Sequence, residues 1–148
     1  MGLFDGLFAA ADILKGGIAA FKATEKLEEL ATTSMDDYDD VLTDESRKLY
    51  QTYVDLHAKQ EDTEDIDEQN AMTDDVEGAL VAYLVSLGAN SSLPRSFRNE
   101  VQGAIVEYQK ANDLSFDLLE KRFMKMAKTD EERDFVRQCM EEAKKDES

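Results

Sequence analysis

Apolar residues recur at helical spacing along most of the chain, and the opening segment shows this most clearly. Eight apolar side chains fall within an arc of roughly 140° on a helical wheel, while Asp5 and Asp12 lie well off that arc. These eight, called the N-terminal stripe below, are Leu3, Phe4, Leu7, Phe8, Ala11, Leu14, Ile18 and Phe21. The pattern predicts an amphipathic helix over 3–32. A bend is expected at Gly16 and Gly17, because each glycine weakens a helix by about 1 kcal/mol relative to alanine.

The same periodicity predicts a string of further helices with short connections. Their expected ranges are 44–60, 74–87, 94–111, 115–128 and a last helix that begins after Thr129. Thr43 and Thr73 are expected as N-caps, since a hydroxyl accepts an unpaired backbone N–H at a helix start. Thr129 and Glu132 have the spacing of a capping box. Pro94 suits the first position of a helix, where its missing N–H does no harm.

One of these helices is apolar on nearly every side. The stretch 74–87 carries leucine, valine, alanine and tyrosine around its whole circumference, which predicts a central, well-covered helix. Gly88 follows it and is expected to stop it in the left-handed conformation. The fold class is therefore predicted to be all-α: an irregular bundle of about five to six helices with an N-terminal amphipathic helix.

Charge divides the chain into three regions. The formal net charge is −17, and residues 35–77 hold most of it. We therefore expect an N-terminal arm at 1–34, an acidic segment at 35–77 with one helix, and a helical core at 78–148. Because closely spaced like charges repel, a flexible, solvated loop is predicted at 61–72. The predicted acidic surface consists of Asp36, Asp37, Asp39, Asp40, Glu61, Asp62, Glu64, Asp65, Asp67 and Glu68.

Candidate chemistry is sparse. From Asp37, the calcium-loop pattern fails at its fifth and sixth positions, Val41 and Leu42. His57 has no second histidine or cysteine nearby, so we expect a surface or helix-end role rather than a zinc site. Cys139 lies on the apolar side of its helix and is expected to behave as a small hydrophobe. We predict no catalytic, cofactor-binding or metal-binding residues, and hence no enzyme.

The sequence favours a non-catalytic interaction or adaptor protein. Its N-terminal stripe would serve as core, as an arm that assembles copies or docks on a partner protein, or as a peripheral membrane anchor. The segment lacks the Lys/Arg-rich polar face that draws such helices to anionic lipid. The single cysteine and the lack of a secretory signal predict a cytoplasmic protein.

The strong negative charge bears on partners in two ways. Direct binding to nucleic acid is not expected, because phosphate contacts need a basic surface. The alternative function is an acidic inhibitor that imitates nucleic acid and fills the basic groove of another protein. This alternative needs carboxylates held at fixed positions, and the expected loop at 61–72 counts against it.

Overall fold

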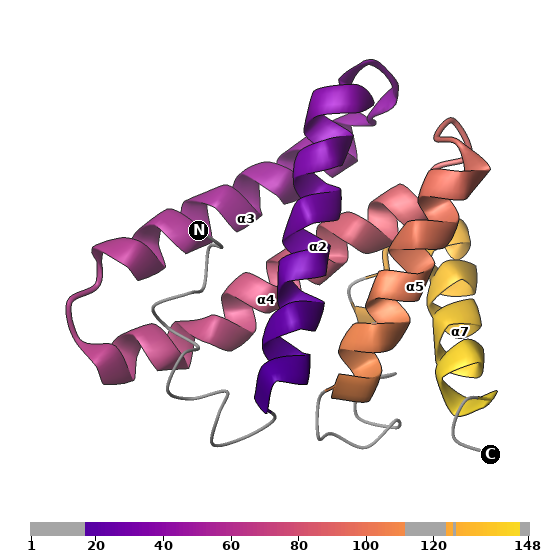
Figure 1. The fold of residues 1–148 in the computed structure, drawn as a ribbon. Coiled ribbons are helices and arrows are strands. Elements are labelled where there is room, and N and C mark those ends of the chain that lie inside the picture. Colours follow the sequence, from indigo (N-terminus) through magenta and orange to yellow (C-terminus); the bar gives the residue numbers. More distant parts are fainter. Residues whose placement is uncertain (1–16, 112–123, 126, 146–148) are drawn as a thin grey trace.

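The computed structural model describes residues 17–111, 124–125 and 127–145, and within these ranges the chain forms helices and no strand (Figure 1). The elements are α2 (Gly17–Asp37), the short 3-10 helix η1 (Asp39–Val41), α3 (Asp44–Asp62), α4 (Ile66–Gly88), α5 (Arg95–Ala111) and α7 (Asp130–Lys145). The predicted all-α bundle is confirmed. Residues 3–16 of the expected first helix and most of 115–128 lie outside the described residues.

Helix α4 is the centre of the bundle. It contacts α2, α3, α5 and α7, and in Figure 1 α3 runs back along it while α2 crosses both helices. Its apolar residues Val76, Leu80, Leu84 and Leu87 have no exposed surface. The predicted central helix is therefore confirmed, and its apolar character over 76–88 matches the several helices that contact it.

Two helix starts form as the sequence predicts. The Thr43 hydroxyl accepts the Ser46 N–H at 3.1 Å and caps α3. The Thr129 hydroxyl accepts the Glu132 N–H at 3.1 Å and donates to the Glu132 carboxylate, also at 3.1 Å. Both threonines thus satisfy a backbone donor that the helix leaves unpaired.

Two other boundaries differ from the prediction. Helix α5 begins at Arg95, and the Pro94 carbonyl accepts the Arg98 N–H at 3.0 Å, so Pro94 precedes the first helical residue instead of occupying it. Gly88 is the last residue of α4, and its backbone is not left-handed. A side chain at Gly88 would collide with the ring of Phe135 from α7. This glycine therefore serves close packing rather than chain reversal.

The predicted loop at 61–72 is wrong in its secondary structure. Helix α3 continues to Asp62, only 63–65 connect it to α4, and α4 begins at Ile66. The Asp65 carboxylate accepts the N–H groups of Asp67 at 2.8 Å and Glu68 at 3.4 Å. Asp65, and not Thr73, is therefore the N-cap.

The charge of this segment does not prevent helix formation. Its carboxylates are exposed, where water and salt screen repulsion. Acidic residues in the first turn, such as Asp67 and Glu68, also interact favourably with the positive end of the helix dipole. The Gln60 side chain donates to the Gln69 carbonyl at 2.8 Å and ties the two helices together at this end.

Candidate interaction surfaces

Most of the N-terminal stripe lies outside the described residues. This applies to Leu3, Phe4, Leu7, Phe8, Ala11 and Leu14, whereas Ile18 and Phe21 fall in the first turns of α2. The stripe therefore leads directly into α2, whose buried residues Ala23, Leu27 and Leu30 belong to the core.

A groove of about 720 Å³ runs between α2 and α5, next to the point where the stripe joins the body. Small residues create it: Ala23 from α2 and Ala104 from α5 are nearly buried, and Gly103 presents no side chain. Nothing lies within 4 Å of where a Cβ on Gly103 would stand. The two helices therefore leave an open channel between them, because the residues that form its floor are small.

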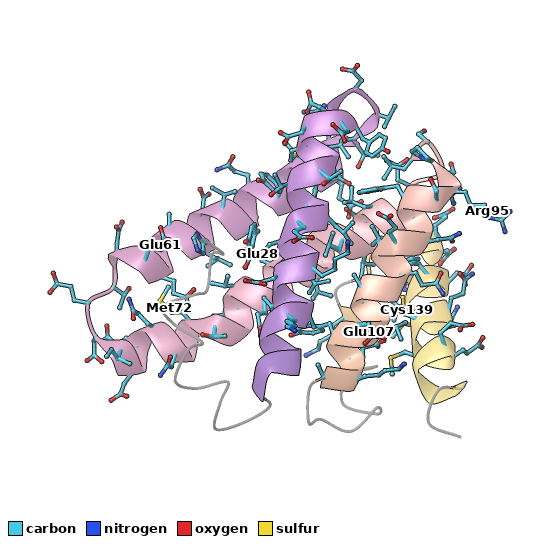
Figure 2. The ribbon with its side chains drawn as sticks, viewed as in Figure 1. Glu28, Glu61, Met72, Arg95, Glu107 and Cys139 are labelled. Carbon is cyan, nitrogen blue, oxygen red and sulfur yellow. The ribbon has the colours of Figure 1, made fainter. Side chains whose placement is uncertain are left out.

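The two edges of this groove differ in charge. Lys22 and Lys26 form the edge on α2, and Glu100 and Glu107 stand on α5. Glu107, which is labelled in Figure 2, lies on the part of α5 that lines the groove. Lys110 also lines the groove, and its ammonium lies 3.7 Å from the Glu107 carboxylate. The groove thus combines a small-residue floor with one basic edge. Sequence reasoning missed it, because nothing in either helix alone indicates that the two align.

The predicted acidic surface divides into two patches. Asp36, Asp37, Asp39 and Asp40 lie where α2 ends and η1 begins, before α3. The other six, called the hairpin patch below, lie at the far end of α3, where α3 and α4 join. They are Glu61, Asp62, Glu64, Asp65, Asp67 and Glu68, all exposed. Helix α3 has 19 residues, so at 1.5 Å per residue the patches are about 28 Å apart.

The two patches have different surroundings. In the first, Asp39 pairs with Arg47 of α3 at 2.7 Å. In the hairpin patch, Glu61 lies 3.6 Å from His57, and Asp65 caps α4. No other carboxylate of the hairpin patch has an ion-pair partner among the described residues. Figure 2 shows Glu61 on α3 and Met72 on α4 at this same end.

His57 is buried, which corrects the expected surface role. Only 7% of the surface of His57 is exposed to solvent. Its ring stacks on the ring of Tyr53, and the two centroids are 6.2 Å apart. The Tyr53 hydroxyl has no hydrogen-bond partner in the described part of the chain. Burial, followed by the negative charge of Glu28, raises the pKa of Tyr53, so its hydroxyl stays protonated. Figure 2 shows Glu28 where α2 passes α3.

Cys139 is buried in the core, as its position on the apolar side of α7 predicts. Burial raises the pKa of its thiol to about 12, so the reactive thiolate is scarce near neutral pH. Across the described ranges, no three His, Cys, Asp or Glu side chains gather closely enough to hold a metal ion.

Comparison with known proteins finds no related protein. No protein-family model, curated protein or solved structure matches this chain. Among the described helices, none combines the length and the apolar character needed to cross a bilayer. Any role of the surfaces described above is therefore inferred from their geometry and charge alone.

Proposed function

We propose that this chain is a non-catalytic helical interaction protein that docks through its N-terminal stripe. The docking target is a second copy, a partner protein or a membrane surface, and the setting is the cytoplasm. One observation carries the proposal: α2, α3, α5 and α7 already contact the central helix α4. The described helices thus cover α4 from several sides, which supports a docking role for the apolar stripe that the sequence predicts in the opening segment.

The acidic surface supports a role in partner choice. Its hairpin patch presents carboxylates on the ends of two helices that Gln60 and Gln69 hold together. Charges of one sign on such a fixed surface steer partners of opposite sign and repel others. The same charge disfavours anionic lipid, so a basic protein suits this surface better than a membrane.

The proposal is tested with two glutamates placed on the stripe, Leu7→Glu with Phe8→Glu. The matched control, Gly6→Glu with Ala9→Glu, adds the same charge off the apolar arc. Light scattering measures the mass of each protein over a wide concentration range, and co-sedimentation measures binding to neutral and anionic vesicles. Circular dichroism checks that each variant keeps its helical content.

We expect the full-length chain to form a defined oligomer or to bind vesicles, and only the stripe variant to lose that behaviour. If the stripe and control variants assemble equally well, docking does not use the stripe. If the stripe variant loses its helical content, the stripe belongs to the core, and the proposal is wrong.

A second candidate function is an acidic inhibitor that imitates nucleic acid. The observation that favours it is the helical order at 61–72, because mimicry requires carboxylates at fixed positions. We propose competition with labelled DNA for a basic DNA-binding protein as the test. Glu64→Gln with Glu68→Gln should weaken competition, whereas Asp36→Asn with Asp37→Asn in the other patch should not. Indifference of several DNA-binding proteins would remove this candidate.

A further inference from the structure

A cleft of about 330 Å³ lies between α5 and α7, beside the last residue of α4. The two helices contact each other, and polar side chains from both line the hollow between them. These are Arg95, Arg98, Asn99 and Gln102 from α5 and Gln138 from α7. Among the described residues, no carboxylate lines this cleft. Acidic residues outnumber basic ones by 34 to 17 in this chain, so two arginines gathered without an acid run against its composition.

These two arginines differ from the other arginines of the described ranges. Arg47, Arg133 and Arg137 each pair with an aspartate, at 2.7, 2.9 and 2.8 Å respectively. Arg95 and Arg98 have no carboxylate partner in the part of the chain that the structure describes. Because a guanidinium stays protonated in proteins, two positive charges remain here for an anion from outside the chain.

The two guanidinium groups are held differently. Arg98 is half-buried, and its Nε donates to the Leu93 carbonyl at 3.2 Å. This bond fixes the group and leaves its terminal nitrogens to donate elsewhere. Arg95 is exposed, and Figure 2 shows its side chain extended into solvent at the start of α5. Arg98 is therefore the fixed donor of the cleft, and Arg95 is the adjustable one.

The position of these charges is unfavourable for the helix itself. Helices α3, α4 and α7 carry acidic residues in their first turns, where the helix dipole favours negative charge. Helix α5 has no acid in its first turn and begins with Arg95, with Arg98 one turn later. Each cation placed at this end costs up to about 1 kcal/mol. A bound anion would offset that cost.

The rest of the cleft supplies further donors and one rigid wall. The carboxamides of Asn99, Gln102 and Gln138 each offer N–H groups, and none of the three has a hydrogen-bond partner among the described residues. The Phe135 ring forms the wall. It packs so tightly on Gly88 that a Cβ there would stand 2.2 Å from the ring, so this side of the cleft is already in place before a ligand binds.

This excess of donors points to an oxyanion. We propose that the cleft binds a phosphate group, either free or carried by a small molecule. A phosphate presents strong acceptor oxygens in several directions, which matches donors that approach from two helices, whereas one guanidinium can satisfy a planar carboxylate. The volume lies at the lower end of the range for ligand pockets, about 300–1,000 Å³, which suits a small ligand. The proposal goes beyond the proposed function and does not depend on the stripe.

The experiment titrates the full-length protein with inorganic phosphate at constant ionic strength, in a buffer that contains no other oxyanion of this kind. Amide chemical shifts from NMR measure the affinity and locate the site. We expect one saturable site with a Kd in the millimolar range or below, and shifts concentrated in 95–102 and 135–138. If binding does not saturate, or if the shifts lie elsewhere, the proposal is wrong.

Arginine substitutions test the donors. Arg98→Gln should weaken phosphate binding about tenfold, since a charge-assisted hydrogen bond contributes at least that factor. Arg95→Gln should weaken it several-fold, and the double variant should remove it. Arg133→Gln and Arg137→Gln are matched controls, because each removes the same charge from an arginine that is already paired. Equal losses in all four variants would indicate general charge attraction and overturn the site.

A second variant keeps the test decisive if Arg98→Gln disturbs the connection before α5 by losing its bond to Leu93. Gln138→Glu places a carboxylate in the cleft from an exposed position on α7 and should abolish phosphate binding. Gln51→Glu, the same change at an exposed position of α3, should not. Circular dichroism checks that helical content is unchanged. Binding that survives both Arg98→Gln and Gln138→Glu would also overturn the proposal.

Phenyl phosphate and acetate identify the ligand class. Tighter binding of phenyl phosphate than of inorganic phosphate assigns the site to an ester whose apolar group meets Phe135, and equal or weaker binding assigns it to free phosphate. Acetate that binds as tightly as phosphate would overturn the proposal in favour of a carboxylate. Leu7→Glu with Phe8→Glu should bind phosphate as the native chain does, so failure of docking and failure of this site are distinguishable.

Discussion

Both halves of α4 are α-helical, but different interactions stabilise them. In the first half, 66–75, most side chains are exposed, and even Ile66 keeps 67% of its surface. The Asp65 carboxylate, which accepts two backbone N–H groups, and the Gln60 side chain, which donates to the Gln69 carbonyl, fix this half. In the second half, 76–88, apolar side chains are enclosed by neighbouring helices.

One helix therefore has two structural roles. Its buried half builds the core, where each side chain must fit its neighbours. Its exposed half is held by a few polar contacts and is free to carry charge. Substitutions should therefore have large effects in the second half and modest, hydrogen-bond-specific effects in the first.

The largest expected effect is at Gly88 in the buried half. Gly88→Ala places a methyl group against the Phe135 ring, and such overpacking costs about 1–3 kcal/mol. The better helix propensity of alanine offsets only about 1 kcal/mol of this. We expect a net loss of stability in urea unfolding. Combining Gly88→Ala with Phe135→Leu should destabilise less than the two single changes summed; strict additivity would contradict the contact.

The next effect is at the cap of the exposed half. Asp65→Ala removes the acceptor for the Asp67 and Glu68 N–H groups and should cost about 1 kcal/mol. Hydrogen exchange should show faster opening in the first turn of α4, with little change beyond Val76. Asp62→Ala is the control for the loss of charge. If both substitutions have equal effects, repulsion rather than capping governs this end.

Removing the hydroxyl group of a buried tyrosine should change stability in opposite directions at two positions. Tyr83 in the buried half lies 2.6 Å from the Ser34 hydroxyl, which donates to the Ala31 carbonyl at 2.7 Å. Tyr83→Phe should therefore cost about 1 kcal/mol. The Tyr53 hydroxyl of α3 is buried and has no such partner among the described residues, so Tyr53→Phe should leave stability unchanged or raise it by up to about 1 kcal/mol. Thermal or urea unfolding of both variants measures the difference, and a clear loss in Tyr53→Phe would contradict the contact pattern.

The smallest effect concerns pH. Burial, and then the negative charge of Glu45, raises the pKa of Glu132 above 4.5. Its stabilising contribution is therefore complete below pH 4.5 and is lost as pH rises through the folded-state pKa. Glu132→Gln removes this dependence, so its stability relative to the native chain should increase between pH 4.5 and neutrality. Glu45→Gln should reduce the same dependence; an unchanged pH profile in both variants would refute it.

Several features of the fold follow from local patterns alone. The helical periodicity of the Phe97, Val101 and Ile105 face predicts a buried stripe on α5, and all three side chains are buried. Thr43 and Thr129 cap helices because a cap needs only residues three positions apart. The positions of the acidic surface are exposed for a similarly local reason, since carboxylates stay in water unless they are paired.

Long-range packing decided the rest. Charge repulsion suggested a loop at 61–72, but Gln60 and Gln69, nine residues apart, join two helices there. His57 is buried in the folded bundle although it lies beside an acidic stretch of the sequence, and Gly88 is required by a ring that is 47 positions away in the chain. The groove between α2 and α5 exists only because Ala23 of one helix and Gly103 and Ala104 of the other lie side by side in space. Outside 61–72, the sequence by itself determined which of the described segments are helical and which faces are apolar, since both depend on neighbours within one turn. Only the tertiary structure decided which faces meet and which remain open, because that depends on side chains from distant helices competing for the same space.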